Sequence, residues 1–183
     1  MMTFGVAFER VIGHEGGLSL HRRDPGNWTG GSVGVGVLRG TRFGISAARY
    51  PREDIQNLTL DRAKQLYHRD FWDRAQADQF PPAVAYQTFD AAVNHGPGTA
   101  IRFLQRALDV ADDGRVGAVT LGALERSDID DVLKRFNAER IRFYVKLSSF
   151  TDFGRGWMER VATNLEYAAD DYNAPWHVQV EAA

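Results

Sequence analysis

A cluster of glycines near the N-terminus constrains the fold of this chain more than any other feature. Residues 26–40 contain six of the 18 glycines found among 183 residues, and Val33, Val35 and Val37 alternate with two of them. Such a stretch cannot continue a helix, because a glycine in a helix interior costs roughly 1 kcal/mol relative to alanine. We therefore predict a short β-hairpin with tight turns over residues 26–40.

On both sides of this segment, apolar residues recur at helical spacing. The predicted helices cover residues 3–15, 46–50, 59–75, 82–93 and 120–125. Three more start at residue 97, at residue 128 and at about residue 156. Their expected end signals are N-caps at Thr3, Thr120 and Asp128, a helix-opening Pro97, and a stop at Gly16-Gly17. A mainly helical chain with one small β-element is an α+β protein.

Charge and cysteine content narrow the range of functions. A formal net charge of −2 gives no electrostatic case for binding nucleic acid or an anionic membrane. The chain has no cysteine for disulfides or thiolate metal sites, and its five histidines lack metal-ligand spacing. No signal-peptide pattern and no stretch of transmembrane length are visible. We expect no cofactor, no metal and no stable membrane insertion.

Glu15 is the first candidate for catalysis. It ends the predicted helix 3–15, where the negative end of the helix dipole disfavours a carboxylate by roughly 0.3–1 kcal/mol. This field, with apolar neighbours such as Leu18 and Phe43, would raise the pKa of Glu15. A carboxyl group that keeps its proton near neutral pH is suited to be a general acid. The alternative is an ordinary surface carboxylate.

Asp24 is the second candidate. It precedes Pro25-Gly26, where an aspartate commonly starts a turn by accepting hydrogen bonds from backbone amides, and this structural role is the alternative. In the functional interpretation, Asp24 stays ionised and faces Glu15 across a sugar. Two carboxyl groups in different protonation states are what glycosidic bond cleavage requires.

Four further side chains are candidates for assisting catalysis or binding substrate. Thr29 and Thr41 lie in or beside the predicted hairpin, where a hydroxyl can hold the nucleophilic water, although β-propensity alone explains either threonine. Trp28 lies in a polar, glycine-rich loop and is a candidate for stacking on a sugar. Asn94 can hydrogen-bond a substrate or, equally, cap the end of its helix.

Several short motifs together resemble glycoside hydrolase family 108, which comprises phage endolysins and related bacterial proteins. They are Glu-Gly-Gly at 15–17, Arg-Asp-Pro-Gly at 23–26, Thr-Arg-Phe-Gly-Ile at 41–45 and Phe-Asp-Ala-Ala-Val-Asn-His-Gly at 89–96. Residues from about 97 to 172 resemble the predicted peptidoglycan-binding region that usually follows in this family. The resemblance implies a lysozyme-like fold with the hairpin at the active-site cleft.

The resemblance also implies a domain division and residue roles. It divides the chain into a catalytic region at 1–96, a helical peptidoglycan-binding region at 97–175 packed with it as one compact unit, and a tail at 176–183. Glu15 is then the catalytic acid. A looser similarity to phage-type lysozymes makes Asp24 and Thr41 its helpers, and Thr41 is preferred to Thr29 because it shortly precedes a Gly-Ile pair.

The implied activity is that of an endolysin. Such a lysozyme hydrolyses the β-1,4 bond between N-acetylmuramic acid and N-acetylglucosamine in bacterial peptidoglycan without a cofactor. We expect a monomer whose partner is peptidoglycan, made in the host cytoplasm and acting on the wall after release. Carboxyl groups roughly 6.5–9.5 Å apart would give inversion, and a separation near 5 Å would give retention.

Three alternatives remain open. A lytic transglycosylase uses one glutamate and lets a hydroxyl of the substrate close an anhydro ring, so Asp24 would be structural. A non-catalytic wall-binding or secretion-helper protein would bind peptidoglycan without cutting it. A metal-dependent amidase is the third, and resistance to chelators would exclude it.

Overall fold

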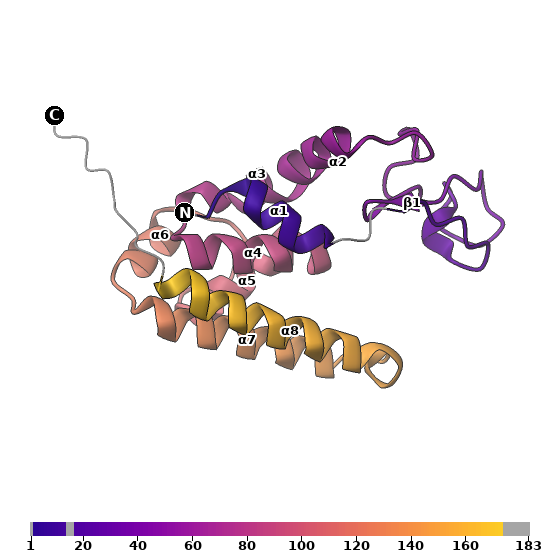
Figure 1. Ribbon diagram of the computed structural model, residues 1–183. Helices are drawn as coiled ribbons and strands as arrows, with labels where there is room; N and C mark the ends of the chain where they lie inside the picture. Colours follow the sequence, from indigo (N-terminus) through magenta and orange to yellow (C-terminus); the bar gives the residue numbers. More distant parts are fainter. Residues whose placement is uncertain (1, 14–16, 174–183) are drawn as a thin grey trace, which may run out of the picture. The chain divides into compact units, whose positions relative to one another are not determined.

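The computed structural model describes residues 2–13 and 17–173, and helices dominate this part of the chain (Figure 1). The α-helices are α1 (Phe4–Ile12), α2 (Leu60–Tyr67), α3 (Asp73–Ala75), α4 (Pro82–His95), α5 (Pro97–Ala107), α6 (Ala118–Glu125), α7 (Ile129–Val145) and α8 (Phe150–Asn173). Strands β1 (Thr41–Arg42) and β2 (Ile45–Ser46) pair antiparallel. The mainly helical α+β fold predicted from the sequence is confirmed. Within the described ranges, no helix combines the length and the apolarity that a membrane crossing needs.

The chain forms two compact units, and the boundary between them falls inside α1 and after His68. Met1–Ala7 and Arg69–Ala183 form the first, here called the helical unit; Phe8–His68 form the second, here called the loop unit. The predicted division into regions 1–96 and 97–175 follows family resemblance rather than contacts, and it stays a prediction. The predicted tail, residues 176–183, lies outside the described residues.

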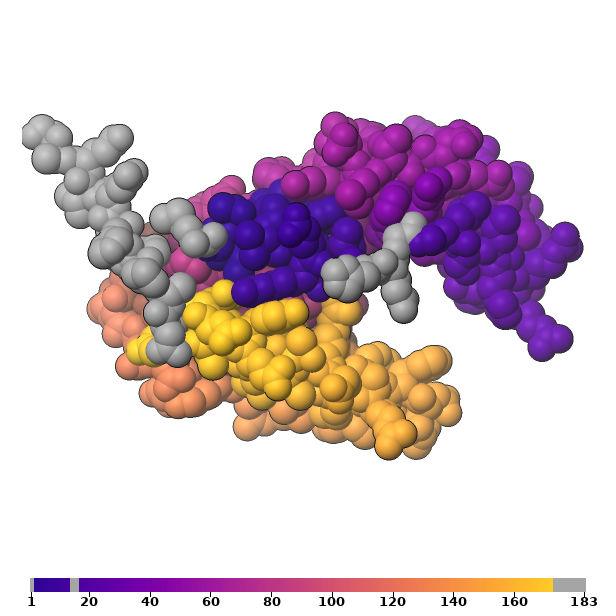
Figure 2. All heavy atoms as spheres, in the orientation of Figure 1, coloured from indigo at the N-terminus to yellow at the C-terminus, as the bar shows by residue number. Residues whose placement is uncertain are grey.

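Helix α4 is the centre of the helical unit. Residues 83–92 of this helix are all buried, as expected of a helix covered on every side. Helices α5, α7 and α8 pack against α4, and α7 and α8 lie side by side (Figure 1). The space-filling view shows α8 at the surface of this unit, which explains why only one of its faces is buried (Figure 2).

Local signals placed several helix ends correctly. The side chain of Asp128 accepts a hydrogen bond from Asp131 N and caps α7, as predicted. Pro97 opens α5, where its missing N–H costs nothing. The helix predicted over residues 59–75 is present as α2 and α3, joined by a π-helical turn, η2 (His68–Trp72).

Other predicted boundaries were wrong. The first helix ends at Ile12 rather than at Gly16-Gly17, because Gly13 adopts φ +57° and stops it earlier. Thr120 is not an N-cap: α6 begins two residues before it, and its buried hydroxyl accepts a hydrogen bond from Gln105 Nε2. Residues 47–49 form a turn rather than a helix, and the last helix begins at Phe150, six residues before the predicted start.

The regular strand pair of the loop unit lies at residues 41–46, just after the segment where we predicted it. Residues 26–40 contain only one isolated bridge among the described residues, between Trp28 and Leu38. Their backbone turns repeatedly instead, with Val35 N donating to Ser32 O and Gly30 N donating to Val35 O. The glycines therefore favour tight turns over a regular ladder.

Candidate active site

Asp24 is held at the first turn of the loop unit by a backbone contact. It precedes the 3₁₀ turn η1 (Pro25–Asn27), and its Oδ1 accepts a hydrogen bond from Gly26 N at 2.8 Å. Its side chain is exposed. The turn-forming role is thus present, and the bond to Gly26 N holds the carboxylate at the surface.

Asn27 ties this turn to the rest of the loop unit. Its side chain is fully buried, with Nδ2 donating to His21 O at 3.0 Å and Oδ1 accepting from the Thr41 hydroxyl at 2.7 Å. Its carbonyl oxygen accepts from Arg39 N and Gly40 N, each at 3.0 Å. A buried amide left without partners would cost roughly 1–3 kcal/mol. Asn27 was not recognisable from the sequence, because an asparagine in a glycine-rich segment signals only a turn.

Thr41 lies on β1, opposite Ser46, and pairs on its other side with Ser19. Ser19 N donates to Thr41 O at 2.8 Å and Thr41 N donates to Ser19 O at 3.0 Å. Because the half-buried Thr41 hydroxyl uses its proton on Asn27, its oxygen lone pairs remain as acceptors. Asn27 therefore links Thr41 directly to the segment that carries Asp24.

Trp28 and Thr29 both stabilise the glycine-rich loop. The Trp28 indole Nε1 donates to Arg22 O at 2.9 Å, and its ring is half-buried, so part of it stays accessible. The Thr29 hydroxyl oxygen accepts from Val37 N at 2.8 Å. Thr29 thus closes the loop on itself, whereas Thr41 joins two separate segments.

Gly40 provides the close backbone approach on which this arrangement depends. It adopts φ +89°, and a Cβ added there would lie 2.4 Å from Ser19 O. No L-amino acid with a side chain fits that conformation and that distance without displacing the pairing of Ser19 with Thr41.

Of the two remaining predicted residues, the structure describes only Asn94. Glu15, the predicted general acid, lies outside the described residues. Asn94 belongs to the helical unit, where it is exposed on the last turn of α4 and its Nδ2 donates to Asp90 O at 2.7 Å. That bond runs to the carbonyl one turn earlier within α4, whereas Gly96 is the residue that ends the helix, and a substrate-binding role for Asn94 stays a prediction. The other four candidates all belong to the loop unit.

A buried ionic cluster centred on Asp90 joins three helices of the helical unit. Asp90, on α4, accepts hydrogen bonds from Arg140 of α7 and from Arg160 and Asn164 of α8, at 2.6 Å from each. Burial acts to raise the pKa of Asp90, but the charges of Arg140 and Arg160 outweigh it and hold the pKa below its usual value. Both carboxylate oxygens are occupied within the unit, so Asp90 is placed for stability rather than for catalysis.

His95 lies in an aromatic box next to this cluster. Its ring centroid is 4.8 Å from that of Tyr144, 4.9 Å from that of Phe143 and 5.6 Å from that of Phe103. Burial, helped by the charge of Arg140, lowers the pKa of His95 to about 4. The imidazole is therefore neutral at pH 7 and unsuited to donate a proton there.

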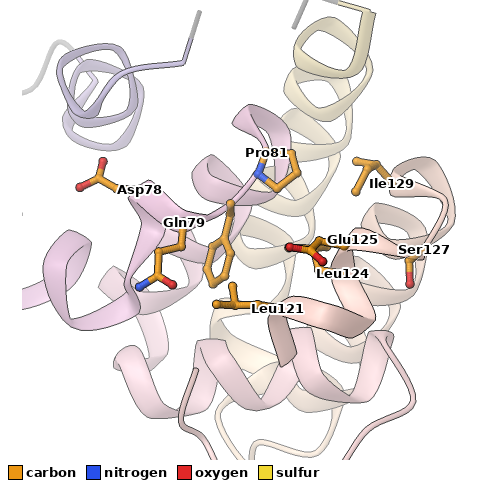
Figure 3. Close-up of a pocket in the computed structure, with 9 residues that line it drawn as sticks. Asp78, Gln79, Pro81, Leu121, Leu124, Glu125, Ser127 and Ile129 are labelled. Carbon is orange, nitrogen blue, oxygen red and sulfur yellow. The ribbon is translucent and has the colours of Figure 1, made fainter. Parts of the chain in front are cut away.

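The helical unit also contains a pocket of about 490 Å³, drawn in Figure 3. Two segments line it; their residues are Asp78, Gln79, Phe80, Pro81, Leu121, Leu124, Glu125, Ser127 and Ile129. Asp78 is held in place because it accepts a hydrogen bond from Trp72 Nε1 at 2.8 Å. None of the predicted site residues that the structure describes lines this pocket.

Comparison with protein families matches two successive parts of the chain. Residues 8–96 match the family described as Glycosyl hydrolase 108, and residues 99–162 match the family described as Predicted Peptidoglycan domain. The first match contains the positions of Glu15, Asp24 and Thr41. A search of curated proteins found no match.

A solved structure extends the comparison to nearly the whole chain. The structure of SagA from Brucella abortus is similar, with 29% sequence identity and a TM-score of 0.78. The similarity covers 93% of this chain and 95% of that chain.

The fold and the two family matches define a glycoside hydrolase that acts on peptidoglycan. Residues 8–96 of the chain match a glycosyl hydrolase 108 domain, and residues 99–162 match a predicted peptidoglycan domain, as the resemblance predicted. The family, the enzyme class and the peptidoglycan substrate predicted from the sequence are thereby confirmed.

Proposed function

We propose that the protein is an N-acetylmuramidase that hydrolyses the β-1,4 bond between N-acetylmuramic acid and N-acetylglucosamine. One observation carries this proposal: the glycosyl hydrolase 108 match spans residues 8–96 and so contains all three candidate catalytic residues. Two of them, Asp24 and Thr41, lie in one hydrogen-bonded segment of the loop unit.

The proposed reaction uses two carboxyl groups on opposite faces of the sugar. Glu15 gives its proton to the glycosidic oxygen as the bond from that oxygen to the anomeric carbon breaks. A water molecule attacks the same carbon from the other face, and its proton passes to the carboxylate of Asp24. The product is inverted, provided that the two carboxyl groups lie roughly 6.5–9.5 Å apart.

Thr41 has a specific part in this scheme. Its hydroxyl proton is given to Asn27 Oδ1, so towards a water molecule the Thr41 oxygen acts as an acceptor. A water that donates one proton to Asp24 and the other to Thr41 has a lone pair left to attack the anomeric carbon. Asn27 is therefore a positioning residue.

The identity of the products tests the proposal. Purified peptidoglycan is digested with the wild-type enzyme, and the fragments are reduced with borohydride and analysed by mass spectrometry. The proposal predicts fragments that end in reduced N-acetylmuramic acid. Fragments that end in reduced N-acetylglucosamine would show that a different bond is cleaved.

A lytic transglycosylase is the second candidate, and the capping role of Asp24 favours it, since the Asp24–Gly26 bond explains this carboxylate without catalysis. An Asp24→Asn variant separates the two, because the amide oxygen can still accept from Gly26 N. The hydrolase would lose roughly 10²–10⁴-fold in rate with this variant. A transglycosylase would keep its rate and release anhydro-muramic products.

The substrate also bears on location. Peptidoglycan lies outside the inner membrane, so the proposal includes action in the periplasm or beyond it, after release from the cytoplasm. Cell fractionation before and after lysis checks this, with activity expected on the wall fraction only after lysis.

A further inference from the structure

A pocket of about 410 Å³ within the loop unit has no part in the proposed reaction. Its lining residues are Val37, Leu38, Arg39, Arg52, Asp54 and Gln56. They come from the end of the glycine-rich segment and from the loop that leads to α2. Two arginines and one aspartate give the pocket a net positive charge beside an apolar wall.

Arg39 is held in place as part of this pocket. Its Nη1 donates to Pro51 O at 3.2 Å and to Glu53 O at 3.4 Å, and its backbone N donates to Asn27 O. The side chain is half-buried. A guanidinium fixed in this way loses little freedom when it binds a ligand, and such preorganisation favours affinity.

The aspartate in the pocket is already engaged. Asp54 Oδ2 accepts from Asn57 Nδ2 at 2.9 Å. This hydrogen bond lowers the pKa of Asp54, and the charge of Arg39 adds to the effect. Asp54 is therefore ionised and offsets one arginine, while Arg52 is exposed at the pocket.

The sequence around this pocket is also rich in positive charge. Residues 17–52 contain six arginines but only one acidic residue, Asp24, although the whole chain has a net charge of −2. Val33, Val35 and Val37 are each more than half exposed, and Val37 also lines the pocket. This surface suits an anionic ligand that also carries apolar groups.

We propose that this pocket binds a carboxylate of the peptide stem that peptidoglycan carries on its muramic acid. The inference rests on the proposed function, which makes a muramic acid bearing this peptide part of the substrate. The N-acetylglucosamine units are neutral and the lactyl carboxyl of muramic acid forms an amide with the peptide, so the free carboxylates belong to the stem. Arginine is the side chain whose planar fork matches a carboxylate.

Binding of a soluble probe tests this without requiring cleavage. The probe is an N-acetylmuramoyl tripeptide that ends in a diamino acid, compared with the same compound whose carboxylates are amidated. Titration calorimetry is done on the wild type, Arg52→Gln and Arg49→Gln. Arg52 is chosen over Arg39 because the contacts of Arg39 hold the loop, and exposed Arg49 provides the same charge change outside the pocket.

We expect Arg52→Gln to weaken binding of the free-carboxylate probe by about tenfold, the effect of roughly 1.4 kcal/mol. Arg49→Gln should bind as the wild type does, and the amidated probe should bind weakly to all three proteins. Equal binding of both probes, or equal loss in both variants, would overturn the inference. So would binding of a phosphate-bearing wall polymer that depends on Arg52 when binding of the tripeptide does not.

The two proposals fail separately. If digestion gives the wrong reducing ends but the tripeptide still binds through Arg52, the proposed bond is wrong and the pocket assignment stands. If the expected muramic ends appear and the tripeptide binds equally to the wild type and Arg52→Gln, only the pocket assignment is wrong.

Discussion

Different kinds of interaction stabilise the interior of the helical unit and the interior of the loop unit. In the helical unit, α4 is buried over residues 83–92, and an ionic cluster around Asp90 joins it to two other helices. The loop unit also buries apolar side chains, such as Ile45 and Ile55, but its glycine-rich segment depends on single contacts, such as the bonds of Asn27 and the close approach at Gly40. A helix buried on every side is therefore central to the first unit, whereas individual polar bonds shape the part of the second that carries Asp24 and Thr41.

The largest effect on stability is expected from the centre of the helical unit. Asp90→Ala leaves Arg140 buried without its partner, which should lower the free energy of unfolding by about 3–5 kcal/mol. Denaturant unfolding measures this. Asp130→Ala is the matched control, because the ion pair that it removes, with Lys134, is exposed and screened by water and salt. Similar losses in the two variants would show that the buried cluster does not stabilise the unit.

The corresponding change in the loop unit is Gly40→Ala. The positive φ of Gly40 and the 2.4 Å approach to Ser19 O predict a loss of roughly 2–4 kcal/mol, with loss of activity. Gly156→Ala, in α8 with open space around it, should be neutral or slightly stabilising. A Gly40→Ala enzyme with full activity would contradict the role given to this backbone approach.

A double-mutant cycle on Asn27 and Thr41 sharpens the comparison. Asn27→Ala should cost roughly 1–3 kcal/mol and Thr41→Val about 1 kcal/mol, because each leaves a polar partner unpaired. The double variant should lose less than the sum, since the two residues share one hydrogen bond. Strict additivity in both stability and activity would mean that Asn27 does not position Thr41.

The smallest effect concerns pH. The pKa of His95 is about 4 in the folded protein and 6.5 in its unperturbed state, so the unfolded chain binds the extra proton between these values. Stability should therefore fall as pH decreases from about 6.5 to 4, by roughly 1–2 kcal/mol after allowing for solvent screening. His95→Phe should flatten this part of the stability curve. An unchanged curve would show that another group titrates there.

The two units also differ in how far the sequence predicts them. The helices of the helical unit follow from local periodicity, and Asp128 was recognisable as a cap because its partner lies three residues away. The ionic cluster was not predictable, since Asp90 and Arg140 are 50 residues apart. In the loop unit, the motifs indicated Asp24 and Thr41 as candidates. Asn27, which joins their segments, was missed because its bond to Thr41 spans 14 residues.

The exact course of the backbone was harder to predict than the class of each element. Gly13 and Gly16 are both plausible helix stops in the sequence, and only the folded backbone shows that Gly13 takes the left-handed conformation. The strand pair likewise forms beyond residue 40, where Thr41 finds Ser19 and Ser46 as neighbours. Such pairings depend on contacts between segments that are distant in the sequence. The periodic spacing of apolar residues carries no information about those contacts.

The proposed reaction requires Glu15 to supply the proton for cleavage of the muramic bond. The direct measurement is the rate at which reducing N-acetylmuramic ends appear from purified peptidoglycan with the wild type and with Glu15→Gln, after thermal unfolding has shown that both are folded. We predict steady release by the wild type and a rate at least about 10²-fold lower for the variant. A folded Glu15→Gln enzyme that releases the same ends at the wild-type rate would contradict the account.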